Sequence, residues 1–248
     1  MQYHLDTIPV WSAMEEGAEC PICALFRKAE QTEVERSLGG SVMEPSARVR
    51  VNERGFCQRH HQQLFQQKNR LGHALMVDSH VQELQKKVER LARQVKDAGG
   101  ARTLFGKRAG TRTDALIAGL EQLSRPCAVC ETLDGHMNRY FYTFLHLWKN
   151  DAKFKAVWDA SMGVGLPHGA ELLRHAQKRL PPAAQRELAA SVLTLLAGQL
   201  KENEEDLAWF TQKFDYRNQD KPWGNSKNAL ERTVNRLRGY CVGDDAKK

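Results

Sequence analysis

Cys20-Pro21-Ile22-Cys23 and Gly55-Phe56-Cys57-Gln58-Arg59-His60 are the stretches on which a prediction of the fold rests. The first places two residues between a pair of cysteines, and the second ends in a cysteine and a histidine with the same spacing. A CxxC pair followed by a CxxH pair has the order and spacing of a tetrahedral metal site. The sequence therefore predicts that Cys20, Cys23, Cys57 and His60 bind one metal ion.

Zinc is the metal that this ligand set favours. Thiolate and imidazole suit zinc, whose closed structural sites use four such ligands. An iron–sulfur cluster is the main alternative, because thiolates also hold it. An ion that joins two distant segments stabilises the fold, because the unfolded chain loses much of its freedom.

The same motifs recur once, with one ligand missing. Cys127 and Cys130 repeat the first cysteine pair at a shift of 107, and Gly163-Val164-Gly165-Leu166-Pro167-His168 repeats the second segment at a shift of 108. We therefore expect two quasi-repeated halves, each opened by a CxxC turn and closed by a CxxH-type helix start.

The second copy predicts a further metal site at Cys127, Cys130 and His168, where Gly165 replaces the third sulfur. Three outcomes remain open: the site has lost its metal, zinc is held by three protein ligands and a water, or another residue supplies the fourth ligand. The candidates for that replacement are His136, His146, His175 and Cys241.

The remaining composition is that of a soluble globular protein: 248 residues, 41% hydrophobic and 27% charged. No run of about 18 apolar residues occurs, so no membrane span is expected. The N-terminus lacks the pattern of a signal peptide, which favours a cytoplasmic location and reduced thiols. A net charge of +7 leaves nucleic acid open as a partner without favouring it.

Helical periodicity between glycine and proline breaks predicts an all-α fold. We expect an N-terminal half at 1–98, a basic glycine-rich linker or loop at 99–112 and a C-terminal half at 113–248. Tyr140, Phe144 and Trp148, at four-residue steps, predict a core stripe. A second buried stripe is predicted for the helix from about 71 to 96, at Leu71, Leu75, Val81, Leu84, Val88 and Leu91.

Two segments, 3–11 and 214–226, mix aromatic, charged and amide residues, which suits either packed termini or a binding site. With the Cys20–Cys23 and Gly55–Cys57 motifs and the segment Gly39-Gly40-Ser41-Val42-Met43-Glu44-Pro45, they make the chain resemble an uncharacterised bacterial family of Cys/His-containing helical proteins. The resemblance spans nearly the whole chain. In that family the second half resembles Phe-Cys-Leu-Pro-His, from which Gly165 departs. The function of the family is unknown, so the resemblance implies no reaction.

The function we expect is that of a zinc-stabilised binding or regulatory module with a protein partner. One alternative is a hydrolase-type zinc enzyme that uses the open three-ligand site, with Glu171 or Asp134 orienting its histidine. The other is a nucleic-acid-binding protein that uses its basic helix faces and the loop at 101–112.

Overall fold

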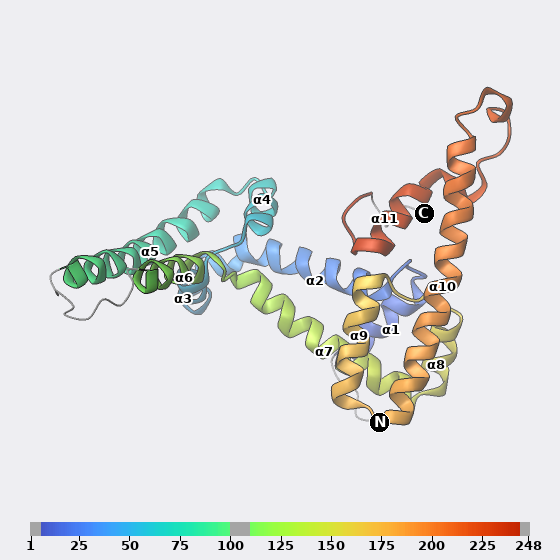
Figure 1. Ribbon diagram of the computed structural model, residues 1–248, viewed down its shortest axis with the longest axis horizontal. Helices are drawn as coiled ribbons and strands as arrows, with labels where there is room; N and C mark the ends of the chain where they lie inside the picture. The colour runs from blue at the N-terminus through green and yellow to red at the C-terminus, as the bar shows by residue number, and fades with distance from the viewer. Residues whose placement is uncertain (1–5, 100–109, 244–248) are drawn as a thin grey trace. The chain divides into compact units, whose positions relative to one another are not determined.

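The fold is built of helices joined by turns over the residues that the structure describes, 6–99 and 110–243 (Figure 1). This computed structural model confirms the expected all-α class, and those ranges contain no strand. None of the helices described there is long and apolar enough to cross a bilayer. The α-helices are α1 (Thr7–Glu15), α2 (Pro21–Leu38), α3 (Pro45–Arg54), α4 (Gln58–Gln66), α5 (Arg70–Gly99), α6 (Gly110–Ser124), α7 (Ala128–Asn150), α8 (Ala152–Asp159), α9 (Leu166–Arg179), α10 (Pro182–Gln212) and α11 (Ala229–Arg238). Short 3-10 helices are η1 (Gly40–Val42), η2 (Tyr216–Asn218) and η3 (Gly224–Asn228).

The chain divides into two compact units. Unit 1 comprises Met1–Lys28 and His136–Lys248, and unit 2 comprises Ala29–Gly135. Unit 2 is therefore inserted in the sequence of unit 1, and the boundaries fall inside α2 and α7. This division differs from the expected halves at 1–98 and 113–248. Residues 100–109 of the expected linker, and residues 3–5 of the N-terminal segment, lie outside the described residues.

Unit 1 is built around the aromatic residues of α7. Phe144 and Trp148 are buried, as the stripe predicts, whereas Tyr140 is half-buried. Phe144 packs edge-on against Phe154 and Trp158 of α8, with ring centroids 5.2 Å from each. Offset and edge-on aromatic pairs add to the stabilisation from burial alone. This core positions the side chains of Cys20 and Cys23, because both cysteines belong to the same set of buried residues.

The C-terminal helices complete unit 1. Pro182 starts α10 at a position where its missing N–H costs nothing, which fixes the break after α9. Leu172 of α9 and Leu188 of α10 are fully buried between these helices. Helix α11 packs against both α9 and α10. As a result, the end of α11 lies beside the start of α9.

Unit 2 contains a turn that demands glycine. Gly55 ends α3 with φ +62°, a left-handed conformation that residues with a side chain rarely adopt. A Cβ atom there would lie 2.4 Å from Nε2 of His80 on α5. The His80 ring is held in place by a 2.9 Å hydrogen bond to the Asn52 carbonyl oxygen. The turn sends the chain directly into the segment with Cys57.

Most of the stripe predicted to be buried on α5 is exposed, whereas Leu84 and Leu91 are half-buried. Leu71, Leu75, Val81 and Val88 are 72%, 41%, 51% and 45% exposed, respectively. Instead, α5 packs on α3 through the face that carries Met76, which is fully buried. Farther along, α5 is paired with α6, where Leu91 contacts Gly119. Apolar periodicity identified the helix correctly but not which of its faces is covered.

Candidate metal centres

Two groups of cysteine and histidine side chains have converging ligand atoms. The Cys57 cluster consists of Cys57, His60, Cys127 and Cys130 and lies within unit 2. The Cys20 cluster consists of Cys20, Cys23 and His168 and lies within unit 1. In each group the ligand atoms all lie within 4.8 Å of one another. Both clusters therefore have donor sets that can bind a metal ion.

Helix starts position the ligands of the Cys57 cluster. Cys57 is the N-cap residue of α4, with φ −77° and ψ 167°, and His60 follows in the first turn. Cys127 directly precedes α7, and Cys130 lies in its first turn. A 3.0 Å hydrogen bond from the Ala128 N–H to the Gly55 carbonyl joins the two segments. The starts of α4 and α7 thus bring the four ligand side chains together.

The distances in the Cys57 cluster fit a single tetrahedral ion. Nδ1 of His60 lies 3.2, 3.3 and 3.4 Å from the sulfurs of Cys57, Cys127 and Cys130. The Cys57 and Cys130 sulfurs are 3.8 Å apart. A zinc ion about 2.3 Å from each sulfur would separate two thiolates by about 3.8 Å. A neutral imidazole nitrogen offers one proton or one lone pair, so it cannot hydrogen-bond three sulfurs at once.

Glu30 holds His60 from behind. Its Oε1 lies 3.2 Å from Nε2 of His60, while its Oε2 accepts hydrogen bonds from Arg59 at 2.7 Å and Gln63 at 3.1 Å. A carboxylate on the far nitrogen fixes the tautomer and orientation of a metal-binding histidine. Glu30 was not among the residues predicted from the sequence. No local signal marks it, because it lies 30 residues before His60 and has no motif of its own.

Electrostatics favour a positive charge at the centre of the Cys57 cluster. Burial alone would lower the pKa of His60, but its bonds to Cys127 and Glu30 raise that pKa to about 10. Burial alone would raise the pKa of Cys127, but the bond to His60 lowers it to about 6. The pKa of Cys130 is raised by burial and by the charge on Cys127. The directions of these pKa shifts favour a thiolate beside a positive charge, and a bound dication would supply that charge.

The Cys20 cluster has similar spacings with one sulfur fewer. Nδ1 of His168 lies 3.5 Å from the sulfur of Cys20 and 3.1 Å from that of Cys23. Burial alone would raise the pKa of Cys20, but bonds to Cys23 and His168 hold it well below its usual value. Burial alone would lower the pKa of His168, but Cys20 and the nearby Glu171 raise it. Glu171 therefore acts on His168 electrostatically.

Gly165 occupies in the Cys20 cluster the position that Cys57 occupies in the other. It is the N-cap residue of α9, with φ −70° and ψ 162°. The backbone of Gly165 helps to hold the pKa of the Cys20 thiol below its usual value. In the same way, the backbone of Cys57 helps to lower the pKa of the Cys127 thiol. Gly163 has φ +70°, close to the value at Gly55. The two local motifs therefore share one backbone conformation, although the expected repeat of whole halves is not confirmed.

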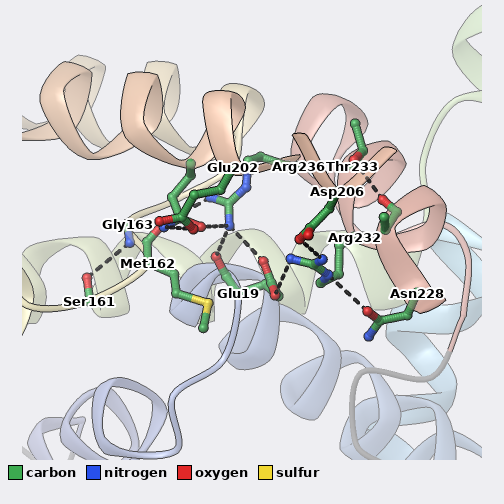
Figure 2. Close-up of polar contacts among 12 residues, drawn as sticks. Glu19, Ser161, Met162, Gly163, Glu202, Asp206, Asn228, Arg232, Thr233 and Arg236 are labelled. Carbon is green, nitrogen blue, oxygen red and sulfur yellow. Dashed lines mark hydrogen bonds and ion pairs between the residues drawn. The ribbon is translucent and has the colours of Figure 1, made fainter. Parts of the chain in front are cut away.

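Helix α11 covers Gly165 on the side where a side chain would be. A Cβ on Gly165 would lie 2.8 Å from the carbonyl oxygen of Arg236. The Arg236 guanidinium is buried and bonds Oε2 of Glu19 at 2.8 Å and the Met162 carbonyl at 3.0 Å. Figure 2 shows these contacts beside the ion pair between Arg232 and Asp206. The absence of a side chain at Gly165 is what allows α11 to approach so closely.

The structure groups the predicted ligands in a different combination. Cys20 and Cys23 lie with His168, whereas Cys57 and His60 lie with the second cysteine pair. The proposed replacement ligands lie outside both clusters: His175 stacks on Phe141, and His136, His146 and Cys241 are likewise not among the converging groups. The carboxylate that contacts His60 is Glu30, which was not among the carboxylates predicted from the sequence.

Comparison with known families gives one result. The model of a family described as a family of unknown function, DUF6062, matches residues 1–244. The chain therefore belongs to that family. No curated protein and no solved structure matches the chain.

Proposed function

We propose that this member of the DUF6062 family is a zinc-stabilised helical protein that acts by binding a protein partner. A zinc ion in the Cys57 cluster ties the start of α4 to the start of α7 and so stabilises unit 2. The observation that carries this proposal is the position of the His60 Nδ1 atom, 3.2 to 3.4 Å from three sulfurs. Because the four side chains fill a tetrahedron, the ion has no position left for a substrate, which is typical of structural zinc.

Zinc is better supported than an iron–sulfur cluster. A cluster distributes its thiolates over different iron atoms, which separates them by more than one ion's coordination sphere. The four ligand atoms here lie within 4.8 Å of one another, as around a single ion. The mixed set of three cysteines and one histidine also suits zinc.

Exposed apolar side chains on α5 and α6 support the binding role. Val81 and Val88, seven residues apart on α5, are 51% and 45% exposed. On α6, Ile117 and Leu120 are 49% and 55% exposed. Residues seven apart on a helix lie on the same face, and an apolar face of this kind is suited to a partner helix. We propose that a helical segment of a partner protein packs there.

The alternative functions have less support. An open zinc enzyme built from Cys127, Cys130 and His168 is disfavoured, because His168 is grouped with the first cysteine pair. Nucleic-acid binding gains no specific contact surface among the described residues, and most of the loop at 101–112 lies outside them.

Metal analysis of a single-residue variant tests the structural zinc. Cys57→Ser should lower the zinc content by one ion per chain relative to the wild type and lower the stability of unit 2. Cys241→Ser is the matched control, because Cys241 is exposed and belongs to neither cluster. An unchanged zinc content in Cys57→Ser, or iron in place of zinc, would contradict the proposal.

Comparative co-purification tests the binding surface. A partner recovered with the wild type should be lost from a Val81→Ser/Val88→Ser double variant. Leu193→Ser in unit 1 is the control, because Leu193 is similarly exposed at 59%. Recovery of the same proteins with all three forms, or of none with any form, counts against this role for α5 and α6.

A further inference from the structure

We infer that the Cys20 cluster binds a second zinc ion, whose fourth ligand is the backbone carbonyl oxygen of Arg236, so that the ion fastens α11 to the rest of unit 1. This inference does not depend on zinc in the Cys57 cluster, because the two groups share no residue. It assigns a metal site to a combination of residues that the sequence motifs do not suggest. It also gives the C-terminal helix a metal-dependent position.

Three corners of a tetrahedron come from side chains. The sulfurs of Cys20 and Cys23 lie 3.5 and 3.1 Å from Nδ1 of His168. The corresponding sulfurs of Cys127 and Cys130 lie 3.3 and 3.4 Å from Nδ1 of His60. Zinc with sulfur at about 2.3 Å and nitrogen at about 2.0 Å requires separations of roughly 3.5 Å between such donors. Two thiolates and a neutral imidazole neutralise the dication.

The fourth corner is defined by comparison with the Cys57 cluster. There it is occupied by the sulfur of Cys57, and Gly165 has the same backbone conformation at the corresponding place. Among the described residues, no further cysteine, histidine or carboxylate joins the Cys20 cluster. The atom nearest to the position of a Cβ on Gly165 is the carbonyl oxygen of Arg236, at 2.8 Å. A carbonyl oxygen of α11 thus lies against Gly165 on the side where Cys57 of the other cluster carries its side chain.

The Arg236 carbonyl is suited to bind a cation. It lies in the last turn of α11, where carbonyls have no partner within the helix and carry the negative end of its dipole. Arg236 is 3% exposed, and no donor in the described ranges hydrogen-bonds its carbonyl oxygen. A buried carbonyl without a partner costs free energy, and coordination to a metal ion would remove that cost.

The Arg236 side chain holds its own carbonyl in place. The guanidinium bonds Glu19, the residue before Cys20, and the carbonyl of Met162, the residue before the Gly163 turn. It therefore contacts both segments that supply the cluster (Figure 2). A ligand held by such contacts needs little reorganisation when the ion binds.

Zinc titration of a glycine variant tests the fourth ligand. Gly165→Ala leaves all three ligand side chains intact but places a Cβ 2.8 Å from the carbonyl, which must then move. We expect one of the two zinc ions to bind about 10- to 100-fold more weakly. Gly198→Ala is the control, because a Cβ there has no neighbour within 4 Å. Wild-type affinity for both ions in Gly165→Ala, or one ion per chain in the wild type, overturns the inference.

Hydrogen exchange tests the role of the ion in fastening α11. Amides of residues 229–238 should exchange faster in Cys23→Ser than in the wild type, while Cys57→Ser should leave them unchanged. Azide added to the cobalt-substituted protein should not alter its ligand-field spectrum, because both ions have four protein ligands. Equal protection of α11 in all forms, or a spectral change with azide, contradicts the assignment.

Discussion

The two clusters share one backbone frame and differ at a single corner. In the Cys57 cluster that corner is a sulfur on the N-cap residue of α4, and in the Cys20 cluster it is Gly165, covered by the end of α11. The histidines also differ, since His60 is 2% exposed and braced by Glu30, whereas His168 is half-buried. Gly165, which has no ligand side chain, thus lies where α11 makes a close backbone contact. In our proposal, side chains supply all four ligands of the Cys57 cluster, whereas a backbone carbonyl of the packed helix α11 supplies the fourth ligand of the Cys20 cluster.

Making the Cys57 cluster resemble its counterpart should have the largest effect. Cys57→Gly removes one of the four converging ligands. We expect loss of that zinc ion and a fall in the free energy of unfolding on the order of 4 kcal/mol or more, because metal binding is folding free energy. Zinc content and urea denaturation measure this, with Cys241→Ser as the control. A variant that retains its zinc would show that three ligands suffice.

Removing the brace on His60 should have the next largest effect. Glu30→Gln keeps the shape of the side chain but removes the charge that orients the imidazole. Zinc should bind the Cys57 cluster about 10- to 100-fold more weakly, as judged by competition with a chelator. Glu35→Gln is the control, because Glu35 lies on the same helix and is exposed. Equal affinities for the two variants would remove Glu30 from the metal centre.

Restoring the missing sulfur should destabilise the protein. In Gly165→Cys the new side chain would collide with the Arg236 carbonyl, because the Cβ atom alone would lie 2.8 Å from its oxygen. Overpacking of this kind costs about 1–3 kcal/mol. Thermal unfolding should show the loss, and α11 should become more sensitive to protease. A Gly165→Cys variant that is more stable and binds zinc more tightly would contradict this prediction, because it would show that α11 moves easily to accommodate the new side chain.

The smallest expected effect is a difference in the pH at which the two clusters release zinc. Protons compete with zinc for thiolate and imidazole, so zinc is bound at neutral pH and lost as the pH falls. The Cys20 cluster has two thiolates and the Cys57 cluster has three, so the first should release its ion at a higher pH. A pH titration with a zinc indicator should give two steps, and Cys23→Ser should lack the step at higher pH. Release from Cys57 first would contradict the ranking.

The sequence allowed the ligand residues to be predicted but not their grouping. Spacing within Cys20–Cys23 or Cys57–His60 reflects one turn of chain, so it identifies ligand pairs. Which pairs meet depends on how long segments fold, and both combinations satisfy the same local rules. The insertion of unit 2 within unit 1 exchanges the partners, and no motif encodes it. Glu30 was missed for the same reason.

The helices show the same limit. Periodicity predicted the aromatic core at Phe144 and Trp148, because a stripe so rich in aromatic residues has to be covered within the unit. On α5 the same reasoning failed. Val81 and Val88 are exposed there, although α5 also packs against α6. The residues Ala47-Arg48-Val49-Arg50-Val51 alternate between apolar and charged, a pattern compatible with a short strand, but they lie within α3, which has Pro45 at its first turn.

Anomalous scattering at the zinc edge from a crystal of the protein is the most direct test. We predict two peaks per chain. One should lie among the Cys57 cluster ligands, and the other among Cys20, Cys23, His168 and the carbonyl oxygen of Arg236. A single peak that joins Cys20 and Cys23 to Cys57 and His60, or no peak at either cluster, would contradict the account.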